Sequence, residues 1–93
     1  MTIECEKMYA VDYVDRYYIG RVLKKSDKEN FYHMKFLHKF SEGGRVLFRW
    51  PKTDDVDEVH ETNIFYGPVH LEGVFEFSLA QLQDIEMTFK NLK

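Results

Sequence analysis

Alternating hydrophobic and polar residues run through the first half of the chain and predict short β-strands. The alternation covers residues 3–13, 17–25, 31–40 and 45–50. Hydrophobic side chains at every second position are typical of a strand with one buried face. Residues 31–40 give the cleanest pattern, and they place Phe36 and Phe40 on the same face.

Breaks in the pattern mark bends and chain connections. Gly20 lies in the middle of the second strand, where a glycine indicates a bulge or the sharp bend of a small barrel. Pro51 has no N–H to donate, so it ends the fourth strand. We expect the polar segment 53–67 to be an acidic connection into a short strand or helical turn near 62–66. A last short strand is expected within 69–77.

The period of the pattern changes at the C-terminal end and predicts an amphipathic helix over residues 78–93. Hydrophobic residues recur there at helical spacing: Leu79, Leu82, Ile85, Phe89 and Leu92. Ser78 and Gln81 have the spacing of a capping box, in which each side chain satisfies a free N–H of the first turn.

Length and composition indicate one small domain. A chain of 93 residues with 44% hydrophobic and 16% aromatic residues can build a single core but no separate catalytic lobe. The only cysteine, Cys5, excludes an internal disulfide, and we expect it to be a buried thiol of the first strand. This cysteine usage fits a reducing compartment, so we expect a nuclear or cytoplasmic protein. No apolar run approaches ~20 residues, so no membrane span is expected.

Charge is unevenly distributed along the chain. Residues 21–52 carry nine Lys and Arg against three acids, whereas residues 53–89 carry nine acids and no Lys or Arg. The acids either pair with the protein's own basic strands or form a surface that orients a charged partner.

The acidic run after Pro51 is the first candidate for chemistry. It contains Asp54, Asp55, Asp57, Glu58, His60 and Glu61. The order of these residues does not match a calcium loop, and a lone His with loop carboxylates is a weak zinc signal. The chain also lacks the common nucleophile, phosphate-binding and zinc-protease motifs. We therefore expect neither enzymatic activity nor a metal or other cofactor.

Basic residues on adjacent predicted strands leave nucleic-acid binding open. Lys35, Lys39, Arg45 and Arg49 could contact phosphates, with Tyr or Phe rings available for base stacking. The overall pI of about 5.8 and the acidic second half argue against a dedicated nucleic-acid binder.

The stretch VDYVDRYYIGRVL resembles the opening of Tudor-type domains, which are SH3-like barrels of the Tudor royal superfamily. In these domains an aromatic residue, a short turn, a second aromatic residue and a small residue precede a bent strand. The stretch FYHMKFLHKF is similar to the second strand of the same family. The resemblance covers about residues 9–66.

The resemblance implies a chromatin-type reader that holds a methylated Lys or Arg side chain in an aromatic cage. By position, the cage residues are Tyr13, Tyr18, Phe36 and Phe40. The acids Asp54, Asp55 and Asp57 would line a rim that faces a basic or methylated peptide. One departure is the pair Ser41 and Glu42, which stands where the family usually has Asn or Asp after the loop aromatics.

These observations predict a mainly β fold: a five-stranded, SH3-like, Tudor-type barrel over residues 1–77, followed by a helix over 78–93. The leading hypothesis is a non-enzymatic protein-interaction module. The alternatives are an assembly or scaffold domain and nucleic-acid binding. In the assembly hypothesis, Leu79, Leu82, Ile85 and Phe89 dock on a partner or a second copy of the chain. A helix that packs on its own barrel remains equally open.

Overall fold

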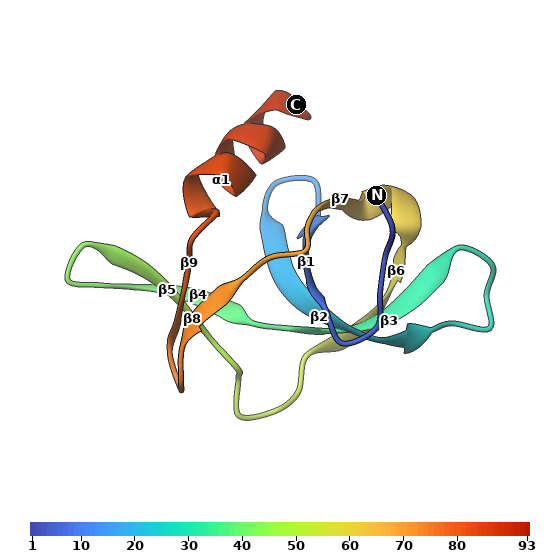
Figure 1. Ribbon diagram of the computed structural model, residues 1–93, viewed down its shortest axis with the longest axis horizontal. Coiled ribbons are helices and arrows are strands. Elements are labelled where there is room, and N and C mark those ends of the chain that lie inside the picture. The colour runs from blue at the N-terminus through green and yellow to red at the C-terminus, as the bar shows by residue number, and fades with distance from the viewer.

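Two antiparallel sheets and one C-terminal helix make up the protein, which a computed structural model describes over residues 1–93 (Figure 1). The strands are β1 (Met8–Asp12), β2 (Tyr17–Lys25), β3 (Phe31–Phe36), β4 (His38–Glu42), β5 (Arg45–Arg49), β6 (Val56–His60), β7 (Ile64–Tyr66), β8 (Leu71–Gly73) and β9 (Phe77–Leu79). A 3₁₀ turn, η1 (Glu61–Asn63), separates β6 from β7, and the helix α1 (Leu82–Asn91) follows β9. The predicted mainly β class with a C-terminal helix is confirmed.

The two sheets differ in how their strands are ordered. The first sheet has the order β6-β3-β2-β1-β7, and the second has the order β4-β5-β9-β8. Strands β1, β2 and β3 form a meander, and the later strands β6 and β7 pair with its two outer edges. The β4–β5 hairpin projects away from the first sheet (Figure 1).

Strands β1 and β2 bury both of their faces, because alternate residues enter two different hydrophobic clusters. The helix-side cluster consists of Met8, Ala10, Tyr17, Ile19, Leu37, Phe48, Val69, Leu79 and Ile85. The second cluster lies on the opposite face of β1 and β2 and consists of Tyr9, Val11, Val22, Met34, Phe36, Val59 and Ile64. The predicted alternation of β2, with Tyr17 and Ile19 opposite Val22, is confirmed.

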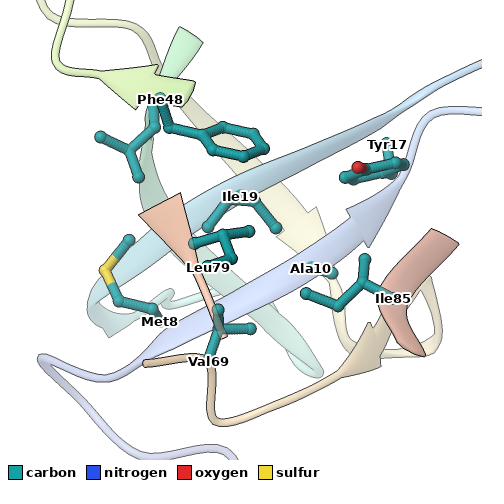
Figure 2. Packing of buried hydrophobic residues seen from close by; sticks show 9 residues of the cluster. Met8, Ala10, Tyr17, Ile19, Phe48, Val69, Leu79 and Ile85 are labelled. Carbon is teal, nitrogen blue, oxygen red and sulfur yellow. The ribbon is translucent and has the colours of Figure 1, made fainter. Parts of the chain in front are cut away.

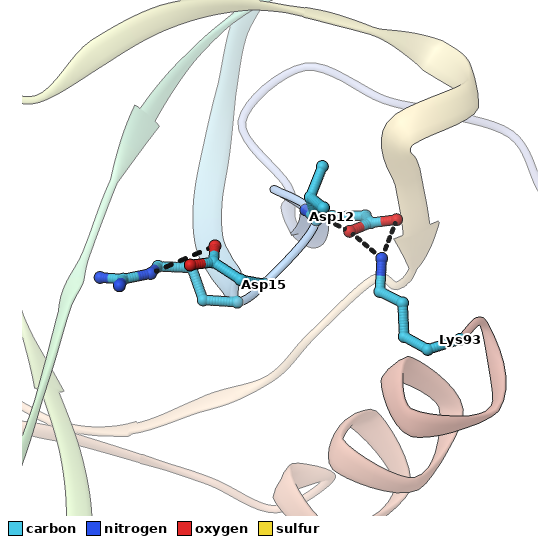
Figure 3. A network of polar contacts seen from close by, with 5 residues as sticks. Asp12, Asp15 and Lys93 are labelled. Carbon is cyan, nitrogen blue, oxygen red and sulfur yellow. Dashed lines mark hydrogen bonds and ion pairs between the residues drawn. The ribbon is translucent and has the colours of Figure 1, made fainter.

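The helix packs on the helix-side cluster. Ile85 has no exposed surface and reaches from α1 toward Ala10 of β1 (Figure 2). Tyr17 and Phe89 make an edge contact with ring centroids 5.5 Å apart. The last residue, Lys93, ties the end of the chain to β1, because its Nζ lies 2.8 and 3.0 Å from the two carboxylate oxygens of Asp12 (Figure 3).

The predicted start of the helix at Ser78 is wrong. Ser78 belongs to β9, where it pairs with Glu72 of β8, so its backbone is committed to the sheet. The Gln81 side chain does not complete a capping box. It accepts a hydrogen bond from the His70 N–H at 2.9 Å and donates one to the Pro68 carbonyl at 3.2 Å.

The predicted single strand over 31–40 is also wrong, because the chain leaves one sheet and enters the other at Leu37. Phe36 N–H donates to the Asp55 carbonyl, and Leu37 N–H donates to the Ile19 carbonyl, each at 2.8 Å. Leu37 is buried in the helix-side cluster. This switch of partners means that Phe40 no longer shares a surface with Phe36.

Part of the acidic segment forms a strand rather than a loop. In β6, Asp57 pairs with Met34 and Glu58 pairs with His33. Val59 is buried, Glu58 is half-buried and Asp57 is exposed, so the burial of this short strand does not alternate strictly. The prediction of an acidic connection therefore holds for the residues before Val56, and the short strand or helical turn expected near 62–66 is confirmed by η1 and β7.

The expected burial of Cys5 is wrong: its thiol is exposed. A turn before β1 interrupts the alternation there, with Lys7 N–H donating to the Glu4 carbonyl at 3.4 Å and Glu6 at a positive φ of 68°. The strand begins only at Met8.

The ten-residue α1 is the only α-helix of the fold, and no helix is long and apolar enough to cross a membrane.

Candidate functional site

Three aromatic rings come together at one end of the first sheet. Tyr13 follows β1, Tyr18 lies in β2 and Phe36 ends β3. The Tyr13 ring centroid lies 5.1 Å from that of Tyr18 and 5.8 Å from that of Phe36, with interplanar angles of 88° and 85°. The Tyr18 and Phe36 centroids are 5.8 Å apart. Three of the four predicted cage residues are thus in mutual contact.

The strand register brings Tyr18 and Phe36 together. Gly20 pairs directly with Phe36, and Tyr18 stands two residues before Gly20 on the same face of β2. The Phe36 ring lies over Gly20, where a β-carbon would come within 2.7 Å of the ring atom Cδ1. Gly20 therefore provides the space for the ring.

The β1–β2 turn sets the position of Tyr13. Asp12 Oδ1 accepts a hydrogen bond from the Val14 N–H at 2.7 Å, and Tyr13 N–H donates to the Arg16 carbonyl at 2.9 Å. The Lys93 ammonium bonds the same Asp12 carboxylate and holds the pKa of Asp12 below its ordinary value. The end of the chain thus helps to fix the turn that carries Tyr13 (Figure 3).

A cavity of about 360 Å³ lies against these rings. Its lining consists of Tyr13, Tyr18, Phe36, Asp55, Val56 and Asp57. Phe36 is only 2% exposed and forms part of the floor, whereas Tyr13 and Tyr18 are half-buried and reach the surface. A ligand that enters here meets both aromatic and acidic residues.

Two of the three predicted rim acids line this cavity, and the third does not. Asp57 Oδ2 accepts a hydrogen bond from the Tyr13 hydroxyl at 2.9 Å. Asp55 Oδ2 lies 3.0 Å from His38 Nε2. Asp54 is directed elsewhere, with Oδ1 at 3.4 Å from the Lys35 ammonium.

Phe40, the fourth predicted cage residue, lies outside the cavity. It belongs to β4 in the second sheet, and the Arg49 guanidinium stacks over its ring at 4.3 Å from the centroid. The prediction is wrong because β3 and β4 are separate strands, and only in one continuous strand would Phe36 and Phe40 share a face.

The predicted partner face of the helix is covered by the protein's own core. Leu79 and Ile85 belong to the helix-side cluster, and Leu82 and Phe89 pack against it. The hydrophobic residue that α1 leaves most exposed is Met87, at 57%. The helix therefore stabilises its own sheets and does not offer this face to a second copy.

Sequence reasoning missed two residues of the site. Val56 lines the cavity, and His38 holds the Asp55 carboxylate. The only sequence signal for β6 is its two β-branched residues, Val56 and Val59, because V-D-E-V does not alternate. The acidic run gathers no group of three or more side chains placed to hold a metal ion.

The four basic residues considered for phosphate contacts do not form one surface. Lys39 and Arg49 line a groove beside the β4–β5 hairpin. Lys35 pairs with Asp54, and Arg45 lies at the turn end of that hairpin, opposite Glu42.

The Tyr13 phenol provides a test of this geometry. Burial, and then the hydrogen bond to Asp57, raise the pKa of Tyr13 above its ordinary value. Because the neutral phenol is favoured in the folded protein, Tyr13 contributes stability below the unfolded-state pKa, and this contribution is lost as pH rises through the folded-state pKa. Replacing Asp57 with Asn removes the negative acceptor, so we expect phenolate formation at a lower pH.

The matched control is Asp54→Asn, which removes the same charge outside the cavity. Carbon chemical shifts of the Tyr13 ring, followed by NMR through an alkaline titration, report the change. If both variants shift the titration of Tyr13 equally, the bond to Asp57 does not form in solution.

In comparisons with known proteins, no family model, no curated protein and no solved structure matches this chain.

Proposed function

We propose that the protein is a non-enzymatic binding module that holds a methylated Lys or Arg side chain of a basic peptide between Tyr13, Tyr18 and Phe36. The observation that carries this proposal is the convergence of three rings on a cavity that Asp55 and Asp57 also line, with the Tyr13 ring nearly perpendicular to the other two.

The first sheet supports a Tudor-type, SH3-like arrangement. A meander of β1, β2 and β3 is flanked by β6 and β7, so the fifth strand of the sheet returns to pair with the first. The irregularity in the pairing of β2 with β3 lies between Val22 and Lys24, not at Gly20, where the bulge or bend was predicted. The β4–β5 hairpin is then an insertion between the third and fourth strands of this sheet.

The chemistry of the cavity favours a cation that is weakly hydrated. Aromatic faces attract a cation by about 0.5 to 2 kcal/mol at each ring, more when the site is desolvated. An unmodified ammonium is compact and strongly hydrated, so removing its water costs more. Methyl groups lower that hydration and contact the rings, while Asp55 and Asp57 supply the opposite charge.

The surroundings of the cavity favour a basic peptide. Its two carboxylates belong to residues 53–89, the segment that carries nine acids and no Lys or Arg. Of these nine acids, Asp55 and Asp57 line the cavity, and they supply the attraction for a positively charged peptide.

Peptide titration monitored by NMR tests the proposal. The probes are one nine-residue basic peptide with a central lysine, prepared unmodified and trimethylated, and the same peptide with a central arginine, unmodified and dimethylated. We expect a methylated form to bind more tightly and to shift the ring signals of Tyr13, Tyr18 and Phe36. Replacing Tyr18 with Leu should weaken that binding by about 1 to 2 kcal/mol, roughly 5- to 30-fold in Kd.

The matched control is Phe40→Leu, which removes an aromatic ring outside the cavity and should leave peptide affinity unchanged. Equal binding of methylated and unmodified peptides, or shifts confined to residues away from the cavity, would contradict the proposal.

A further inference from the structure

A second hollow lies on the β4–β5 side of the molecule and differs in chemistry from the aromatic cavity. The groove measures about 610 Å³. Its lining includes His38, Lys39, Phe40, Arg49, Trp50 and Lys52. No Asp or Glu lines it, although the chain as a whole carries a net charge of −3. We refer to it as the basic groove.

The positive charges of the basic groove are only partly neutralised. His38 contacts Asp55, and the Lys39 ammonium lies 3.9 Å from Glu86. Arg49 and Lys52 take part in none of the seven ion pairs of the structure. Two cations with no carboxylate within 4.0 Å therefore line the groove, with two residues of chain between them.

The groove also presents flat groups. The Arg49 guanidinium covers the Phe40 ring at 4.3 Å from its centroid, and Trp50 is only partly buried. The cationic groups of Arg21 and Lys35 each lie 4.8 Å from the Trp50 ring centroid, and these two cations are themselves paired with Glu6 and Asp54. Nucleic-acid bases stack on aromatic rings and on guanidinium planes alike.

We infer that the basic groove binds single-stranded nucleic acid, with Arg49 and Lys52 on phosphates and Trp50 or the Arg49–Phe40 stack against a base. An acidic peptide would satisfy the cations but would not use the flat groups. This combination of unpaired cations and stacking surfaces favours a ligand that alternates phosphates with planar rings.

Trp50 gives the experiment its most direct readout, because it is the only tryptophan of the chain. The probes are fluorescein-labelled oligouridylate and oligothymidylate of twelve residues, measured by anisotropy over a range of salt concentrations. Unlabelled oligonucleotides of the same length are used to follow Trp50 emission. We expect binding that weakens as salt rises, together with quenching of Trp50 by base stacking.

The test variant is the double substitution Arg49→Ala and Lys52→Ala. If both side chains contact phosphates, the slope of log K against log salt should fall in magnitude by about 1.4, and the affinity at low salt should drop roughly tenfold. Lys25→Ala is the control, because Lys25 is exposed at the far end of β2 and should leave the oligonucleotide affinity nearly unchanged. His38 is left intact, since it also touches Asp55 of the aromatic cavity.

Two outcomes would overturn the inference. One is an oligonucleotide affinity that is the same in the double variant and in Lys25→Ala. The other is a poly-glutamate peptide of equal charge that binds as tightly as the oligonucleotides, which would assign the groove to acidic peptides. Circular dichroism establishes that each variant is folded. Tyr18→Leu should retain oligonucleotide binding, so failure of the methyl-peptide proposal leaves this result unaffected.

Discussion

Replacing Ile85 with alanine is expected to lower the free energy of unfolding by about 2 to 5 kcal/mol. Ile85 has no exposed surface and joins α1 to the strands of the helix-side cluster. Truncating the side chain removes contacts there and leaves a cavity that the surrounding strands fill only in part. Urea denaturation, followed by circular dichroism, measures the change.

Met87 provides the matched control on the same helix. Its side chain is 57% exposed, so Met87→Ala should change the free energy of unfolding by no more than about 0.5 kcal/mol. Small and equal effects of both substitutions would mean that α1 does not dock on its own sheets in solution. Analytical sedimentation of the unmodified chain completes the test. Because the helix face is covered within one chain, we expect no dimer to form through it.

The residue pattern gave β2 correctly because that strand lies between two cores. Tyr17 and Ile19 enter one cluster, while Val22 enters the other, so the alternation reflects real burial on both faces. For the same physical reason, the residues predicted for the partner face of the helix are ones that the structure buries or half-buries. Ile85 and Phe89 recur at helical spacing because both pack on the strands.

Other parts of the fold depend on pairing partners that the sequence pattern does not specify. The alternation of 31–40 continues across Leu37, but the hydrogen bonds at this point change from one sheet to the other. Ser78 matches a capping signal, yet its backbone pairs with Glu72 of β8 and does not begin the helix. At Leu37 the partner is distant in sequence, and at Ser78 it lies six residues away in a hairpin, but in both cases strand pairing overrides the pattern of the segment itself.

The residues of the candidate site also differ in how far the sequence pattern can predict them. Tyr13 and Tyr18 flank one tight turn, so local spacing was sufficient to group them. Phe36 joins them through the pairing of β2 with β3. The prediction of Phe40 is wrong because β3 ends at Phe36. The prediction of Asp54 rests on its place in an acidic run, but its side chain pairs with Lys35. A run of like charges does not indicate the direction of each side chain.

Replacing Gly20 with alanine should damage both the fold and the aromatic cavity. The added β-carbon would lie 2.7 and 2.8 Å from two atoms of the Phe36 ring and 3.2 Å from the Lys35 carbonyl. Phe36 is 2% exposed, so its ring has little room to move. We expect a loss of about 1 to 3 kcal/mol in the free energy of unfolding, the usual cost of overpacking a core. Methyl-peptide binding should weaken as the ring is displaced.

The double substitution Gly20→Ala with Phe36→Leu separates crowding from a general effect on β2. Leucine is smaller than the ring and more easily rearranged, so it relieves the clash. The double variant should therefore be more stable than the sum of the two single effects predicts, with a coupling of about 0.5 to 3 kcal/mol. It should not regain peptide affinity, because the ring itself is gone. Strict additivity of the two effects on stability would show that Gly20 and Phe36 are not in contact in solution. It would also remove the floor of the proposed cage.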